Sequence, residues 1–523
     1  MAAVMGIDVG TGGLRALVID AQSGALLGAA TAEYPLSTPH PQWAEQDPQD
    51  WWRAAQAAIP EALRRAGGRA GEVLGLGLTG QMHGLVLLDE QDAPIRPAML
   101  WCDQRTEAQC EEIHRVVGRE RLLAIARNPA LTGFTAPKVL WVREHEPEAY
   151  RRVRRALLPK DYLRLRLSGE YATDVADASG TLLLDVGRRA WSEDLLAALE
   201  IPREWLPAVY EGPEVVGRVS AEGARATGLA EGLPIVAGGG DQAAGGVGNG
   251  VVREGVVSCT IGTSGVVFAA MGGAGSAGGV GGGAVPEALQ LFCHSVPGMW
   301  HVMGVTQGAG LSLRWLRDEV ADAERGVAAR VGGEAYELLT QEAARAPAGC
   351  EGLLFLPYLM GERAPHLDPD ARGGWIGLTA RHTRADLVRS VMEGVTYSLR
   401  DCMGLLEEAG VGPTEVRASG GGARSALWRQ MQADVFGLPV VLLDNAEGPA
   451  FGAALLAGTG VGLYPDVATA CAQTLREAGR VQPDEGRRAV YAGYYEAYRR
   501  LYPALKETFG ELAALARGGE GER

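Results

Sequence analysis

The chain carries the same strand, glycine turn and strand twice, and this internal repeat constrains its fold more than any other feature. In the first copy the apolar residues 4–8 lead into the turn GTGG at 10–13, and in the second copy residues 256–261 lead into GTSG at 262–265. Each turn is followed by a second apolar run, which predicts a hairpin in each half. The repeat therefore predicts two similar domains that face each other across a cleft. In this register Asp8 corresponds to Thr260, so only the first half carries the acid.

Length supports the same division. A chain of 523 residues exceeds what one hydrophobic core usually supports. We expect one domain over residues 1–249, a second over 250–512, and a disordered tail over 513–523. The cleft between two such domains is the default place for a ligand.

Composition narrows the function classes. The formal net charge of −15 argues against nucleic acid or a membrane as partner, because both require a basic surface. No apolar stretch has transmembrane length and no secretory signal is visible, so we expect a cytoplasmic protein. The seven cysteines form no CxxC pair and are expected to be reduced and mostly buried. The three lysines, Lys138, Lys160 and Lys506, do not form a P-loop motif.

One carboxylate stands out by its position. The apolar run LPIVA at 233–237 is followed by GGGDQAAG at 238–245. Glycines permit a sharp turn and a close ligand, so Asp241 is expected at a strand end facing the cleft, where a catalytic carboxylate belongs. The alternative is that Asp241 only caps the following helix.

Three glycine turns, at Gly10, Gly262 and Gly420, suggest phosphate binding. Amides at such turns can donate to phosphate oxygens, and hydroxyls stand beside two of the turns in Thr11, Thr263 and Ser264. Taken alone, each turn is better explained as a plain hairpin, and it is their recurrence at positions related by the repeat that favours phosphate binding. Asp8 fits a role in organising Mg²⁺ through water, and its alternative role is to cap a turn.

Other residues suggest a polyol site. His83, within GQMHG at 80–84, could bond a sugar hydroxyl, or it could be a core histidine. Trp101 and Asp103 could offer a stacking face and a carboxylate, although a core position is as plausible for the tryptophan. The glycine-rich residues 272–283 are expected to form a mobile loop.

From about residue 4 to residue 500 the chain resembles the FGGY family of carbohydrate kinases. The stretches that carry the resemblance are GQMHG at 80–84, FTAPK at 134–138, LPKDYLR at 158–164, residues 238–245 and residues 420–424. The family resemblance implies an α/β fold of two actin-like (ribonuclease-H-like) ATPase domains flanking a central cleft. It also implies ATP-dependent phosphorylation of a ketopentose at its terminal hydroxyl. Residues 81–84 resemble members that act on D-xylulose, whereas members that act on glycerol carry an Arg-Glu pair there.

Carried over by position, the resemblance assigns roles to individual residues. Asp241 would be the catalytic base and Asp8 an acid needed for activity, with Mg²⁺ held by Asp8 through water and by Asp241. The sugar would contact Gln81, Met82, His83, Trp101, Asp103, Asp241 and Gln242. ATP would contact Thr11, Gly12, Arg15, Gly262, Thr263, Gly421 and Gly422. Gly12 departs from the family pattern, since many relatives have serine there.

Two other classes of function remain open at this point. A sister kinase acting on ribulose, gluconate or glycerol would keep Asp241 and change the sugar wall around His83. A non-catalytic actin-like ATPase would keep the phosphate turns without needing Gln81, His83 or a base at Asp241. ATP and Mg²⁺ are the expected cofactors, and a homodimer is a further expectation.

Overall fold

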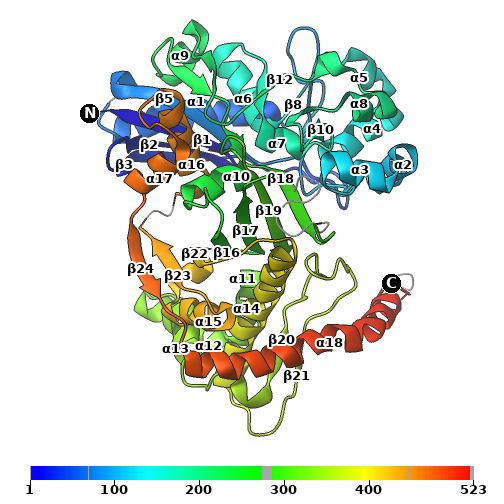
Figure 1. The fold of residues 1–523 in the computed structure, drawn as a ribbon, viewed down its shortest axis with the longest axis vertical. Coiled ribbons are helices and arrows are strands. Elements are labelled where there is room, and N and C mark those ends of the chain that lie inside the picture. The colour runs from blue at the N-terminus through cyan, green and yellow to red at the C-terminus, as the bar shows by residue number, and fades with distance from the viewer. Residues whose placement is uncertain (1, 69, 274–284, 445–446, 519–523) are drawn as a thin grey trace.

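The computed structural model describes residues 2–68, 70–273, 285–444 and 447–518 (Figure 1). Most of the tract expected to be a mobile loop, residues 274–283, lies outside the described residues. All seven cysteine thiols are free and six of them are buried, as expected from the sequence. Among the described residues no helix is both long enough and apolar enough to cross a membrane.

The first large sheet is built around the first repeated hairpin. Its strand order is β13 (Val215–Arg218), β14 (Pro234–Val236), β5 (Val73–Gly80), β1 (Ala3–Val9), β2 (Gly13–Asp20) and β3 (Leu26–Glu33), and β15 (Gly239–Gly240) also pairs with β5. β1, β2 and β3 form an antiparallel meander, while β5 lies parallel to β1. Nearly every apolar side chain on β1 and β2 is buried, because helices cover both faces of this sheet.

The second large sheet repeats this plan. Its order is β18 (Leu289–Cys293), β19 (Trp300–Thr306), β17 (Gly265–Met271), β16 (Val256–Ile261), β22 (Glu415–Gly420), β23 (Val440–Leu443) and β24 (Glu477–Val481). β16 pairs antiparallel with β17 and parallel with β22, as β1 does with β2 and β5. The repeat predicted from the two glycine turns is therefore confirmed.

Helices surround the two sheets. Those up to residue 248 are α1 (Pro48–Arg65), α2 (Glu107–Val117), α3 (Arg119–Ala126), α4 (Thr135–His145), α5 (Pro147–Arg152), α6 (Pro159–Ser168), α7 (Val175–Ser179), α8 (Glu193–Leu199), α9 (Ala221–Thr227) and α10 (Asp241–Gly248). Those that follow are α11 (Ala309–Val320), α12 (Asp322–Val331), α13 (Ala335–Ala343), α14 (Arg384–Glu408), α15 (Ala426–Phe436), α16 (Gly448–Gly460), α17 (Val467–Thr474) and α18 (Glu485–Gly518).

Short strand pairs complete the fold. They are β4 (Glu45–Gln46) with β7 (Ala98–Met99), β6 (Val86–Leu88) with β8 (Arg155–Leu157), β9 (Ala172–Asp174) with β12 (Ala208–Tyr210), β10 (Leu184–Asp185) with β11 (Ala190–Trp191), and β20 (Leu354–Leu356) with β21 (Gly374–Ile376).

α16 lies in sequence between β23 and β24 of the second sheet but packs on the first sheet, as its place beside β1 and β5 in Figure 1 shows. The approach is so close that a Cβ on Gly6 would overlap the carbonyl oxygen of Ala450, and a Cβ on Gly77 would overlap that of Ala453. On its other side α16 meets α10, where a Cβ on Gly452 would overlap the carbonyl oxygen of Ala244. Glycine is therefore required both on the first sheet, at Gly6 and Gly77, and on α16, at Gly452. These contacts join the two halves of the chain.

The expected tail is partly helical. α18 continues through Gly518, and Ala513 is buried against the second domain. Phe509, one turn before Ala513, packs in the core of the second domain and holds this end of the helix against it. Disorder from residue 513 was thus the wrong expectation for 513–518, and 519–523 lie outside the described residues. The boundary at residues 249 and 250 falls between α10 and β16, and the division into domains there stays a prediction.

Replacing Gly452 with alanine should weaken the joint between α10 and α16. Overpacking of this kind costs about 1–3 kcal/mol, so we expect a lower midpoint in urea denaturation. The matched control is Gly493→Ala on α18, where a Cβ meets no described atom within 4 Å outside its own helix. The control should leave the midpoint unchanged or raise it, because alanine favours a helix over glycine by about 1 kcal/mol. Equal midpoints for the two variants would contradict the close packing.

Candidate functional site

Two carboxylates lie at the carboxyl ends of the two parallel strands that flank β5. Asp8 on β1 lies opposite Thr79 on β5, and Gly239 on β15 lies opposite the same Thr79 from the other side. Asp241 follows β15 directly as the first residue of α10. The ends of parallel strands in an α/β sheet are where ligands bind, so Asp8 and Asp241 occupy the predicted position.

The electrostatics of this pair suit a base and a cation site. Burial, with a further contribution from the charge of Asp241, raises the pKa of Asp8 to about 7 against the opposing effect of Arg15. Burial raises the pKa of Asp241 to about 6, although hydrogen bonds from Gln242 oppose the shift. Within the described residues Oδ1 of Asp8 is buried and has no hydrogen-bond partner. Burying a carboxylate oxygen without a hydrogen-bond partner costs free energy of folding, unless a bound ligand supplies the partner.

The first glycine turn is connected to the predicted sugar residues. The hydroxyl of Thr11 donates to Oε1 of Gln81 (3.1 Å) and accepts from the indole Nε1 of Trp101 (2.9 Å). Trp101 is 46% exposed, so one face of its indole is open to a ligand. Gln81 is buried and donates to Gln46 (2.9 Å), which places it behind the turn as a support. Gly12, at the tip of the turn, is exposed.

His83 is held in an unusual conformation. Its backbone has φ of +67°, and its carbonyl oxygen accepts from Nζ of Lys138 (2.9 Å) and from the hydroxyl of Thr135 (3.1 Å). Burial lowers the pKa of the imidazole to about 3, so the ring is neutral. Nδ1 lies 2.7 Å from the carbonyl oxygen of Gly180, which can only accept. Nδ1 therefore carries the proton, and Nε2 is left as an acceptor for a hydroxyl.

Glycines make room for Met82 and His83 beside Asp241. A Cβ on Gly240, the residue before Asp241, would lie 2.6 Å from Cγ of Met82. A Cβ on Gly180 would lie 2.6 Å from Nδ1 of His83. The structure thus brings together the two motifs that the sequence singled out separately.

A buried ion cluster supports both motifs, and sequence reasoning did not assign it a role. Nζ of Lys160 contacts three carboxylates, those of Asp161 (2.7 Å), Asp174 (2.7 Å) and Asp177 (3.1 Å). Arg164 donates to Asp161 and to the carbonyl oxygen of Ala237, both at 2.5 Å. Ala237 precedes the Asp241 turn, and α7, which Asp174 caps, ends next to Gly180. The cluster therefore holds the two sides of the site in register.

The second glycine turn mirrors the first. Gly262 and Thr263 are exposed, and their carbonyl oxygens accept from the amides of Gly310 (2.8 Å) and Leu311 (3.0 Å) at the start of α11. Thr260 and Ser419 share a hydrogen bond of 2.6 Å at the register position that Asp8 and Thr79 occupy in the first sheet. The predicted difference between the two copies is therefore present in the structure.

The predicted adenosine residues lie beside this turn. Ile261, which precedes Gly262, is opposite Gly420. Gly420 has φ of +75° and leads into the short 3₁₀ helix η4 (Gly421–Arg424). A Cβ on Gly422 would lie 2.6 Å from Cβ of Ile261, so glycine allows η4 to sit directly on β16. Gly421 is exposed at the same edge.

The charged side chains of two predicted site residues, Arg15 and Asp103, are paired with other protein groups. Arg15 pairs with Glu447 at 2.5 Å, just before α16. Asp103 has no exposed surface, and its oxygens accept from Arg105 (2.6 Å) and from the amide of Ala44 (2.7 Å). The sequence could not reveal the bond from Ala44, which is distant in sequence, whereas Arg105 is only two residues from Asp103. This geometry disfavours Asp103 as a sugar ligand.

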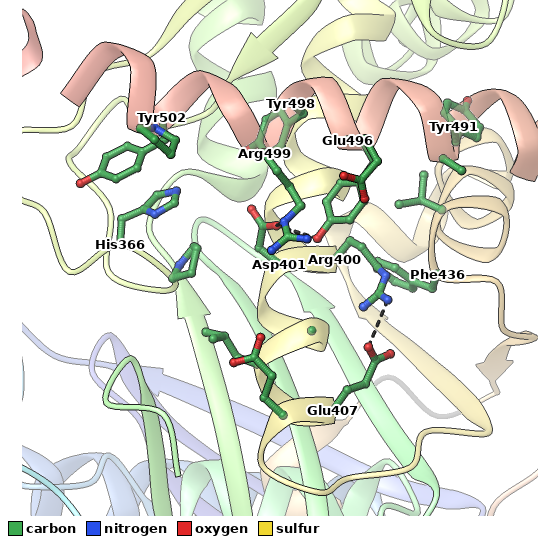
Figure 2. Close-up of a pocket in the computed structure, with 18 of the residues that line it drawn as sticks. His366, Arg400, Asp401, Glu407, Phe436, Tyr491, Glu496, Tyr498, Arg499 and Tyr502 are labelled. Atoms are coloured by element: carbon green, nitrogen blue, oxygen red, sulfur yellow. Dashed lines mark hydrogen bonds and ion pairs between the residues drawn. The ribbon is translucent and has the colours of Figure 1, made fainter. Parts of the chain in front are cut away.

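A cavity of about 790 Å³ lies away from these turns, between α14 and α18 (Figure 2). Its lining includes Tyr358, His366, Arg400, Asp401 and Tyr498. Arg400 pairs with Glu407 (3.1 Å), and Asp401 accepts from Tyr495 (2.6 Å). None of the predicted site residues lines it.

Comparison with known proteins identifies the family to which the chain belongs. Residues 3–248 match the N-terminal domain of the FGGY family of carbohydrate kinases, and residues 257–461 match its C-terminal domain. The xylulose kinase of Escherichia coli K12 is 41% identical over 96% of this chain and 99% of its own length. A crystal structure of xylulose kinase from Rhodospirillum rubrum superimposes with a TM-score of 0.87 at 32% identity, covering 97% of this chain and 100% of that one.

The chain therefore belongs to the FGGY family of carbohydrate kinases, and it is a sugar kinase with two actin-like domains and ATP as a substrate. Within that family, both relatives named above are xylulose kinases. A gluconate kinase from Lactobacillus acidophilus also reaches a TM-score of 0.87, at 24% identity over 98% of this chain and 99% of that one. The shared fold alone does not choose the sugar.

Replacing Gly180 with alanine should displace the imidazole of His83, because 2.6 Å is shorter than any ordinary contact of a Cβ with nitrogen. We expect KM for the sugar to rise by roughly tenfold to 10²-fold, while KM for ATP changes little. Steady-state kinetics with each substrate varied in turn measures both. Gly71→Ala, where a Cβ meets no described atom within 4 Å, is the control. An unchanged KM for the sugar would exclude His83 from the sugar wall.

Proposed function

We propose that this kinase transfers the γ-phosphoryl group of ATP to the terminal hydroxyl of D-xylulose, giving D-xylulose 5-phosphate and ADP. The near-full-length similarity to the Escherichia coli xylulose kinase carries the choice of sugar. The Met82 and His83 wall beside Asp241 supports it, since a neutral imidazole acceptor and an apolar surface suit an uncharged ketose.

Asp241 acts as the general base in this proposal. The hydroxyl oxygen of the sugar forms a bond to the γ-phosphorus, and the bond from that phosphorus to the β-phosphate bridging oxygen breaks. ADP leaves with the electron pair, and the proton of the hydroxyl passes to Asp241. A pKa of about 6 leaves the carboxylate ionised at neutral pH yet more basic than an exposed aspartate. Because phosphoryl transfer has a loose transition state, proton removal comes late and alignment dominates.

The two carboxylates fit a Mg²⁺ site. The described residues contain no group of three or more metal-ligating side chains, but Mg²⁺ typically uses one or two carboxylates, water and substrate phosphates. Oδ1 of Asp8 is buried without a partner and supplies a hard oxygen of the required kind. Asp8 would hold the ion through water and Asp241 would complete the set. When bound, Mg²⁺ would neutralise charge on the phosphate oxygens.

ATP is expected to lie along the glycine turns. The exposed turn residues Gly12 and Thr263 would present backbone amides to the phosphates, and Gly262, whose amide donates to the carbonyl oxygen of Ser264 (3.0 Å), would let the phosphates approach the backbone closely. Thr11 and Arg15 would lie beside them. Gly421 and Gly422, at the adjoining edge of the second sheet, would face the adenosine. Trp101 and Gln242 would flank the sugar. The homodimer and the cytoplasmic location stay predictions.

Asp241→Asn should reduce kcat about 10²- to 10⁴-fold, the usual contribution of a general base, while the dissociation constant for ATP stays within a few-fold. ADP release and equilibrium binding of ATP measure the two quantities. Asp194→Asn is the control, because this aspartate is 70% exposed and its contact with Arg121 is a surface ion pair of 3.4 Å. A variant that keeps wild-type turnover would remove Asp241 from the mechanism.

A panel of sugars tests the substrate separately. Wild-type enzyme should show its highest kcat/KM with D-xylulose among D-xylulose, L-ribulose, D-ribulose, glycerol and gluconate. If another sugar is preferred, the base assignment survives and the choice of xylulose fails. If no sugar stimulates ADP release, the kinase proposal for this chain fails.

A further inference from the structure

The cations around the site are almost all engaged by protein partners. Arg15 pairs with Glu447, and Nζ of Lys138 is taken by the carbonyl oxygens of His83 and Gly133. Lys160 is surrounded by carboxylates. Arg363 differs from these, since its half-buried guanidinium makes no hydrogen bond or ion pair with any residue that the structure describes. Burial lowers the pKa of this guanidinium, as expected for a cation without a counter-ion.

The loop that carries Arg363 is fixed next to the second phosphate turn. The carboxylate of Glu362 accepts from the hydroxyl of Thr306 (2.6 Å) and from the amide of Gln307 (2.9 Å). The amide of Ala364 donates to the carbonyl oxygen of Val305 (3.0 Å). Thr306 lies opposite Gly265, the residue that ends the turn. The backbone of Arg363 is therefore attached to the strand that borders the turn.

The other side of this loop is fixed to α18. His366 stacks on Tyr502 with ring centres 3.6 Å apart and planes 9° from parallel. Nε2 of His366 lies 3.1 Å from the hydroxyl of Tyr358, and Figure 2 shows His366 beside Tyr502 at one end of the cavity. Arg363 is thus presented by a rigid loop held from two directions.

The charge of Arg363 also affects His83, one of the residues of the first domain that are predicted to bind the sugar. One apolar cluster contains Met82 and Phe134 together with Phe292 and Met303 of the second sheet, so the two walls are continuous. Burial is the main cause of the low pKa of His83, and the positive charges of Lys138 and Arg363 lower it further. Arg363 therefore lies between the phosphate turn of the second sheet and the sugar wall of the first.

We propose that Arg363 is a catalytic residue whose guanidinium binds the phosphoryl group as it passes from ATP to the sugar hydroxyl. A neutral sugar cannot supply the missing counter-ion, whereas a phosphoryl group brings negative charge to this position. The planar guanidinium can bond two phosphoryl oxygens at once. It would approach from the second domain, while Asp8 and Asp241 stand on the first. This role rests on the proposed function, because it requires a phosphoryl group in the cleft.

Arg363→Gln should reduce kcat about 10²- to 10³-fold, the usual effect of removing one donor that stabilises transition-state charge. KM for ATP and for the sugar should stay within about threefold. Arg363→Lys should recover part of the loss, because lysine keeps the charge without the two-pronged geometry. The matched control is Arg372→Gln, since Arg372 lies in the same connection between β20 and β21 and donates to the carbonyl oxygens of Pro369 and Ala371.

Chemical rescue separates a catalytic role from a structural one. Adding guanidinium ion at low millimolar concentration to Arg363→Ala should raise its kcat at least tenfold, and should not change Arg372→Ala. A rise in KM for the sugar with unchanged kcat would overturn the proposal, because Arg363 would then bind the sugar. A loss of kcat without rescue would overturn it as well. The comparison uses whichever sugar the wild-type enzyme prefers, so failure of xylulose as substrate is detected independently.

Discussion

Two carboxylates are held at the ends of β1 and β15, the strands on either side of β5, against their mutual repulsion and the cost of burial. The register of β1, β5 and β15 fixes Asp8 and Asp241 in place, and the raised pKa of each records the unfavourable environment. Such strain persists only where the surroundings are rigid. Here the buried ion cluster of Lys160 and Arg164 supplies that rigidity, because it ties the strand before Asp241 to the helix beside His83. The two carboxylates are thus positioned to receive a cation and a hydroxyl.

The internal repeat divides the chemistry between two copies of one topology. The first sheet has an acid and a threonine where the second has Thr260 and Ser419, which share a neutral hydrogen bond. The first copy can therefore hold a metal and a base, while the second offers exposed turn amides to phosphates. α16 joins the copies through contacts that only glycine permits, at Gly6, Gly77 and Gly452. A joint of this kind fixes one helix of the second half of the chain on the first sheet.

Sequence reasoning predicted the parts of this site that depend on local pattern. The hairpins, the strand end at Asp241 and the presence of an acid in only the first copy follow from apolar runs, glycine turns and the register of the repeat. Contacts between distant segments were not predictable in the same way. The placement of α16 on the first sheet, the bond from the amide of Ala44 to Asp103 and the role of the Lys160 cluster all depend on which segments meet in space. Arg363 was missed for the same reason, since its loop is distant in sequence from both glycine turns. The helical tail through Gly518 was missed because its end is rich in glycine.

The most direct test of the central claim is a crystal structure of the enzyme with D-xylulose and a non-hydrolysable ATP analogue. The account predicts that the terminal hydroxyl of the sugar lies within hydrogen-bond distance of the Asp241 carboxylate, about 2.6–3.2 Å, with the γ-phosphate on the opposite side of that hydroxyl. A sugar whose terminal hydroxyl contacts Asp8 alone, or no carboxylate, would contradict it.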